Sequence, residues 1–104
     1  MEHFASTSTE PLAVRAIRTD TNPTANTVAM FLKAVGAEPP ATTDVGWVTG
    51  TWQTTAQQSN GLWKTDAWFT LTANAYTDGI YDVYIWIDGS TYDPVRLAGT
   101  IAIY

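Results

Sequence analysis

Histidine and cysteine, the side chains that most often carry catalysis or bind metal, are scarce in this chain. Its 104 residues include one histidine, His3, and no cysteine. A Ser-His-Asp arrangement or a zinc site needs histidine held beside ordered partners. His3 stands in a polar stretch, residues 1–10, where no such partner is expected. We therefore predict no catalytic residue, no metal site and no cofactor.

Four aspartates lie close together in the last third of the sequence: Asp78, Asp82, Asp88 and Asp93. Clustered carboxylates suit calcium, and a carboxylate pair across a cleft can hydrolyse glycosides. Their spacing matches no calcium-loop pattern, however, and Asp78 and Asp88 each precede a glycine, as turn residues commonly do. A sandwich of this length also leaves little room for a cleft. We expect turn and surface roles for these carboxylates.

The chain holds five tryptophans and five tyrosines, more large rings than one core of this size can enclose. Two-residue alternation assigns Trp63, Phe69 and Tyr81 to the core. It places Trp68, Tyr84 and Trp86 on the opposite face, with Trp47 or Trp52 beside them. These five residues are predicted to bind a partner. Exposed aromatic patches mark binding surfaces for protein or sugar. The alternative is that these rings pack under loops or under a folded-back N-terminal arm.

Short strands must position these side chains. Thr, Val, Ile, Trp and Tyr suit pleated, half-buried surfaces, and apolar residues recur at every second position. The expected strands cover residues 12–17, 27–34, 46–54, 62–72, 80–88, 95–97 and 100–104. This spacing predicts an all-β fold: a small antiparallel β-sandwich, immunoglobulin-like, with about six or seven strands, or else a small barrel. Residues 27–34 could alternatively form a two-turn helix, which the surrounding β pattern disfavours.

Two glycine positions predict local features of the sheets. Asn60 followed by Gly61 is the strongest short signal for a hairpin, so the strands on either side should be antiparallel neighbours. Gly50 interrupts the segment 46–54 and is predicted to mark a bulge or a point of close packing.

One domain accounts for the chain, because 104 residues can bury a single modest core. The Ser/Thr-rich residues 1–10 are predicted to be a flexible N-terminal arm, or a segment that a partner orders. Residues 11–104 are predicted to form a single β-sandwich domain.

The charge of the chain bears on its partners. The net charge is −5, and the five basic residues are scattered along the sequence. Nucleic acid requires clustered cations and anionic lipid would repel the chain, so neither is expected as a partner. The N-terminal residues lack the basic and apolar regions of a signal peptide, and no apolar run could span a bilayer. The chain is therefore expected to remain in the cytoplasm where it is made.

Two classes of function fit these observations. The first is a non-catalytic structural module that docks onto a larger assembly through aromatic faces and strand edges. The second is a carbohydrate-binding module that stacks Trp68, Trp86 and a neighbouring tyrosine on sugar rings. The missing signal peptide favours the first class, and an enzyme is a distant third.

Four segments carry a resemblance to a known group of proteins. They are a turn and strand at residues 22–28 (NPTANTV), a W-x-x-G-x-W pattern at 47–52, a strand at 79–87, and a closing segment at 94–103. In this order they resemble small structural proteins encoded among the head and head–tail genes of tailed bacteriophages. The resemblance covers most of the chain after residue 10.

The resemblance implies a virion component, such as a capsid-decorating or head–tail joining protein. It also implies other virion proteins as partners: capsid, portal or connector, or tail subunits. Many copies would then join in a symmetric assembly built in the bacterial host cytoplasm, where weak contacts become collectively strong.

Overall fold

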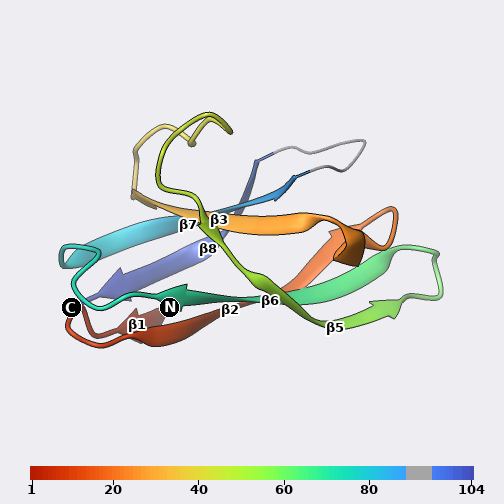
Figure 1. Cartoon of the computed structure of the whole chain (residues 1–104), viewed down its shortest axis with the longest axis horizontal. Helices are drawn as coiled ribbons and strands as arrows, with labels where there is room; N and C mark the ends of the chain where they lie inside the picture. Colours follow the sequence, from red (N-terminus) through yellow and green to blue (C-terminus); the bar gives the residue numbers. More distant parts are fainter. Residues whose placement is uncertain (89–94) are drawn as a thin grey trace.

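The computed structural model describes residues 1–88 and 95–104, which form two facing β-sheets (Figure 1). The strands are β1 (Glu2–Phe4), β2 (Glu10–Thr19), β3 (Thr27–Ala34), β4 (Val48–Thr49), β5 (Thr51–Gln57), β6 (Trp63–Leu71), β7 (Gly79–Asp88) and β8 (Arg96–Ile103). One short 3-10 turn, η1 (Pro23–Ala25), precedes β3. Its Asn22 side chain accepts a hydrogen bond from the Thr24 amide at 3.1 Å, which caps this turn.

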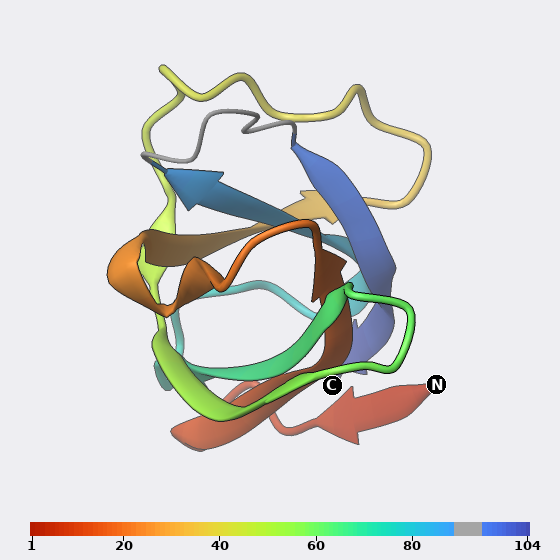
Figure 2. The same cartoon turned by 90° about the vertical axis from the view of Figure 1, so that its right-hand side faces the viewer.

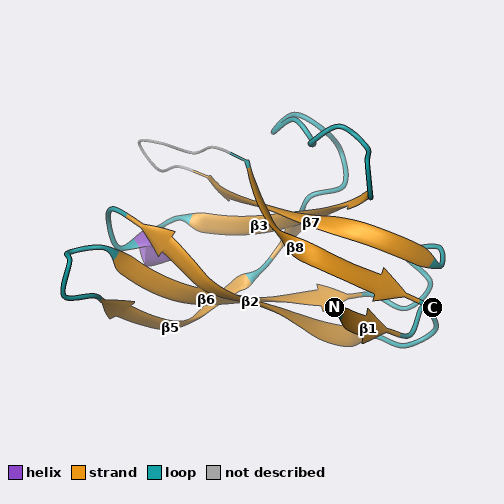
Figure 3. Cartoon of the chain, turned by 180° about the vertical axis from the view of Figure 1, so that it is seen from behind, coloured by secondary structure: helices purple, strands orange, loops and turns teal. Residues whose placement is uncertain are grey.

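Sheet A has five strands in the order β1-β8-β7-β3-β4, and sheet B has three in the order β2-β6-β5. The two layers lie one above the other (Figure 3). The pairing of β1 with β8 is parallel, whereas the other pairings between the described strands are antiparallel. The predicted all-β sandwich is confirmed, and the described residues form eight strands in place of the expected six or seven.

Alternating side chains from the two sheets form the core, as the two-residue period predicts. β3 buries Val28, Met30 and Leu32, and all eight of its residues pair with β7, so residues 27–34 form a strand and not a helix. Sheet B contributes Phe69 and Leu71 from β6. The predicted core position of Phe69 on β6 is therefore confirmed, and Tyr81 on β7 is partly buried against the core.

The segment 46–54, expected as one strand, is divided between the sheets at Gly50. Residues before Gly50 form β4 and pair with β3 in sheet A, whereas those after it form β5 and pair with β6 in sheet B. The Gly50 amide donates to the Val28 carbonyl at 2.9 Å. A Cβ atom at this position would overlap the Phe69 ring and lie 2.8 Å from the Trp68 carbonyl oxygen. Close packing at Gly50 is thus confirmed, and it occurs where the chain crosses between the sheets.

The hairpin predicted at Asn60 and Gly61 joins β5 to β6. The Gln58 amide donates a hydrogen bond to the Leu62 carbonyl at 2.7 Å, and the Leu62 amide donates one to the Asn60 side-chain oxygen at 3.0 Å. Gly61 has a φ of 86°, a conformation that residues other than glycine adopt at a cost.

The N-terminal segment differs from the flexible arm that was expected. Residues 2–4 form β1 on the edge of β8, and the Phe4 side chain is buried in the core. The Tyr104 amide donates to the Phe4 carbonyl at 2.9 Å, and the Ser6 amide donates to the Tyr104 carbonyl at 2.6 Å. Residues 1–10 are mostly polar, and the prediction gave no weight to Phe4 among them. The burial of Phe4, together with these hydrogen bonds, makes the segment part of the sandwich.

Candidate functional site

The five aromatic residues predicted to bind a partner do not share one face. Trp68 lies on the outer face of β6 in sheet B, where 42% of its surface is exposed. Tyr84 and Trp86 lie on the outer face of β7 in sheet A, on the opposite side of the sandwich. Alternation predicts correctly that Trp68, Tyr84 and Trp86 point away from the core, but it cannot show that they belong to different sheets.

The loop of residues 35–47 lies over the outer face of sheet A (Figure 2). Trp47, at its end, packs against Phe31 and Trp86, with ring centroids 5.3 and 5.5 Å apart. The Trp47 indole also donates to the Ala41 carbonyl at 3.1 Å, within the same loop. Tyr84 is only 7% exposed, so its predicted exposure is wrong. For Trp47 and Trp86 the alternative stated for these rings, packing under a loop, describes the structure.

Trp52 also has a structural role. Its indole donates to the Asn26 carbonyl at 2.8 Å, and its ring packs against the core. The hydrogen bond ties β5 in sheet B to the residue just before β3 in sheet A. Of the five predicted partner-binding residues, Trp68 is therefore the one whose ring is mostly free of such contacts.

The polar candidates are dispersed. His3 lies on β1 with its ring 6.2 Å from that of Tyr104, and the Asp82 carboxylate accepts from the Thr100 hydroxyl at 3.2 Å. Asp78 and Asp88 are exposed at either end of β7, while Asp93 falls outside the described residues. Across residues 1–88 and 95–104, no group of three or more histidine, cysteine or acidic side chains is placed to hold a metal ion.

An open edge of the sandwich, between β2 and β8, was not predicted. Within the described part of the chain β2 pairs only with β6, and residues 96–100 of β8 pair only with β7. Two adjoining hollows of about 140 and 210 Å³ lie between these strands. We call them together the β2–β8 groove.

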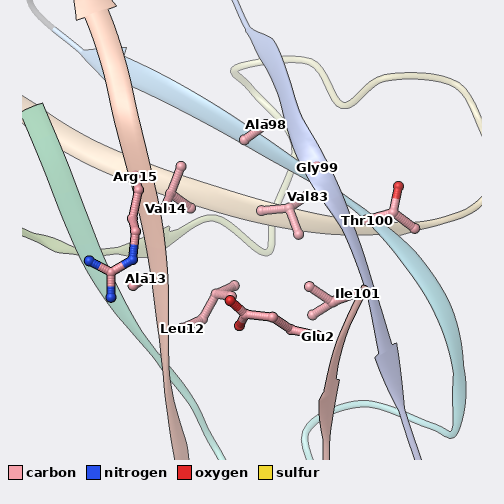
Figure 4. Close-up of a pocket in the computed structure, with 10 residues that line it drawn as sticks. All are labelled: Glu2, Leu12, Ala13, Val14, Arg15, Val83, Ala98, Gly99, Thr100 and Ile101. Atoms are coloured by element: carbon pink, nitrogen blue, oxygen red, sulfur yellow. The ribbon is translucent and has the colours of Figure 1, made fainter. Parts of the chain in front are cut away.

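The groove has an apolar floor and a polar rim. In the smaller hollow Val14 from β2 and Val83 from β7 line the floor, and the Glu2 side chain extends from β1 toward Leu12 (Figure 4). In the larger hollow Val14 is joined by Ile17 and Ile85. Val14, Ile17, Val83 and Ile85 are core residues, so the groove reaches the side of the hydrophobic core.

Three of the five basic residues line the larger hollow: Arg15, Arg18 and Arg96. An Arg96 guanidinium N–H donates to the Arg18 carbonyl at 2.7 Å, which holds the start of β8 against the end of β2. Arg15 and Arg18 are 78 or more positions away from Arg96, so a scan of the sequence for basic clusters cannot find this group. The antiparallel course of β2 and β8 brings them together.

A bulge in β2 shapes the same rim. Two residues, Arg15 and Ala16, lie opposite the single residue Asp66 on β6. Ala16 has a φ of 59°, in the left-handed region, and its amide donates to the Asp66 carboxylate at 2.9 Å. The Arg15 guanidinium lies 3.9 Å from the other Asp66 oxygen. The sequence carries no glycine here to indicate a bulge, so alternation alone continued the strand without one.

A tyrosine pair closes one end of the sandwich. Tyr76 packs against the core with its ring 6.0 Å from that of Tyr81, and the Tyr81 hydroxyl donates to the Thr77 carbonyl at 2.7 Å. Burial of the Tyr76 hydroxyl, with a smaller contribution from Tyr81, raises the pKa of Tyr76 above its ordinary value of 10.0.

Comparisons with known proteins found no matching family model, no matching curated protein and no matching solved structure. Among the described residues there is no helix of the length and apolar character needed to cross a membrane.

Proposed function

We propose that the chain is a non-catalytic interaction protein of a tailed-bacteriophage particle, acting in capsid decoration or head–tail joining. Its partners would be other virion proteins, and many copies would act in one symmetric assembly. The resemblance of residues 22–28, 47–52, 79–87 and 94–103 to small phage structural proteins supports the class of particle. The exposed features of the sandwich support docking as the activity.

The open edge of the sandwich is the observation that carries this proposal. Residues 96–100 of β8 have no neighbouring strand on the side away from β7, and β2 has none on the side away from β6, among the described residues. Unpaired strand edges present backbone N–H and C=O groups to which a further strand can be added. On the same edge of β8, β1 is already paired with residues 101–103.

Trp68 offers a second contact on a different surface. It lies on sheet B between its cross-strand neighbours Ala13 and Thr51, both smaller than itself. A large ring that stands above small neighbours is the kind of anchor on which protein interfaces depend. Docking through Trp68 and through the open edge would engage two sides of the molecule.

The carbohydrate-binding alternative has less support in the arrangement of rings. A sugar platform needs exposed aromatic faces lying side by side, but Trp47 and Trp86 are inclined by 57° and packed together under a loop. Trp68 has no aromatic neighbour among its cross-strand partners. A glycan array tests this alternative: Trp68-dependent binding to defined sugars would favour it over docking.

The protein content of purified phage particles tests the proposed function. Phage particles would be purified by density gradient from a culture that encodes this sequence, and their proteins quantified by mass spectrometry. We expect the chain in the particle band in a fixed ratio to the major capsid protein. A chain that stays entirely in the soluble fraction would contradict the proposal.

A further inference from the structure

We propose that the β2–β8 groove binds an extended, acidic segment of a partner protein, which pairs as an added strand with residues 96–100 of β8. The inference rests on the proposed docking function and names the kind of partner that this edge accepts. Three independent properties of the groove support it: the backbone of its edge, the side chains of its floor and the charge of its rim.

The backbone of β8 can accept a further strand. β1 occupies this edge only from Ile101 to Ile103, which leaves the five preceding residues without a partner on that side among the described residues. Strands usually alternate their N–H and C=O groups between two neighbours, so part of this stretch faces the groove unpaired. A short partner strand would occupy the line that β1 leaves vacant.

The floor of the groove suits the side chains of such a strand. Successive side chains of an extended peptide point in opposite directions, so every second one would face Val14, Val83 and Ile85. Leu97, at the rim, is 60% exposed and offers further apolar contact. We therefore expect the occupant to carry apolar residues at alternate positions.

The rim selects an acidic occupant. Arg18 and Arg96 place positive charge on one hollow of a chain whose net charge is −5. The Arg15 guanidinium lies 3.9 Å from the Asp66 carboxylate, and Glu2 lines the adjoining hollow, so the positive charge is local to the end of the groove beside Arg18 and Arg96. Guanidinium groups bind carboxylates well, often through two hydrogen bonds. Long-range repulsion from the acidic remainder of the molecule disfavours a polyanion such as nucleic acid, whereas a short segment needs only the local field. The backbone of a peptide can also form hydrogen bonds with the unpaired N–H and C=O groups of β8 in a strand ladder, which a nucleic acid cannot do.

A peptide library tests the inference. Random eight-residue peptides displayed on yeast would be sorted for binding to the labelled full-length chain. We expect the enriched peptides to contain more acidic than basic residues, with apolar residues alternating between them. Enrichment of basic peptides, or no enrichment above a display-only control, would overturn the inference.

Two charge-reversal variants then locate the binding. For one enriched peptide, Arg18→Glu should weaken binding at least about fivefold, the effect of one favourable ion pair of about 1 kcal/mol. Lys33→Glu makes the same change of charge on β3, none of whose residues line the groove, and should leave the affinity unchanged. Thermal melting would verify that both proteins are folded. Equal affinities for Arg18→Glu and the unmodified chain would then contradict the groove as the binding site.

Amide exchange supplies a readout of strand addition. The peptide should slow hydrogen exchange at some amides of residues 96–100, and an unchanged exchange pattern there would contradict pairing with β8.

The proposed function and the proposed peptide site can fail separately. A chain present in particles that selects no acidic peptide docks by another surface, whereas a chain that binds acidic peptides through Arg18 but is absent from particles has a different biological role.

Discussion

Gly50 has no side chain because two other residues occupy the space that one would need. The Phe69 ring and the Trp68 carbonyl would both contact a Cβ atom there, and the Gly50 amide is bonded to the Val28 carbonyl. Neither the buried ring nor the backbone can move away freely. The position therefore depends on glycine for packing and not for an unusual backbone angle.

We predict that Gly50→Ala destabilises the protein by about 2–3 kcal/mol, the upper part of the range expected when a well-packed core must accommodate an added carbon atom. Urea denaturation followed by tryptophan fluorescence would measure the loss. Thr51→Ala, at the exposed next position, serves as the control and should change stability by less than about 0.5 kcal/mol. A Gly50→Ala protein as stable as this control would contradict the packing described here.

Tyr76 predicts a dependence of stability on pH. Its pKa is raised in the folded protein, chiefly by burial, so the fold favours the protonated phenol. The corresponding stability is complete below pH 10, the ordinary value, and is lost as the pH rises through the folded-state pKa. The melting temperature should therefore fall above pH 10, and fall less in Tyr76→Phe. Tyr104→Phe, which removes an exposed tyrosine, should retain the full decrease. Parallel melting curves for all three proteins would contradict the assignment to Tyr76.

At the scale of elements, β1 depends on one apolar anchor. Phe4 belongs to the core cluster, while Glu2 and His3 are exposed. Because the strand has only three residues and pairs with a single neighbour, its ladder alone would hold it weakly. We therefore expect the buried Phe4 ring to supply most of the free energy that keeps β1 in sheet A.

We predict that Phe4→Ala costs about 3 kcal/mol, near the lower limit for removing a buried aromatic ring. It should also release β1, which would appear as faster amide exchange at residues 101–103. His3→Ala changes the neighbouring exposed position and should leave both quantities nearly unchanged. Exchange rates in Phe4→Ala that match those of the unmodified chain would show that the ladder holds β1 without its anchor.

The whole molecule presents two unlike outer faces. Sheet A is covered by the loop of residues 35–47, with Trp47 and Trp86 packed beneath it, whereas sheet B leaves Trp68 exposed. Two tryptophans that the alternation of the sequence treats alike therefore have different roles, one in stability and one available for contact.

We predict that Trp86→Ala lowers the free energy of unfolding by about 3 kcal/mol, whereas Trp68→Ala lowers it by less than about 1 kcal/mol. Chemical denaturation of the isolated protein measures both. In a particle-binding assay Trp68→Ala should weaken association although the protein stays folded. Equal losses of stability in the two variants would contradict the difference between the faces.

Features that depend on residues close together in the sequence could be predicted from it, whereas features that depend on distant segments could not. The two-residue period of β6 and β7 and the Asn60–Gly61 turn are local, and each predicted its element correctly. The crossing at Gly50, the burial of Phe4 and the gathering of Arg18 with Arg96 depend on pairing between distant segments. Alternation reports which way a side chain points, but it does not report which strand or loop lies opposite.

The parallel pairing of β1 with β8 determines how the protein would respond to a pull on its ends. β1 begins the described chain and β8 ends it, side by side and in the same direction. Opposite forces on the two termini would slide these strands past each other, so their hydrogen bonds would bear the load together. An antiparallel pair loaded in the same way would open one bond at a time, like a zip, at a much lower force.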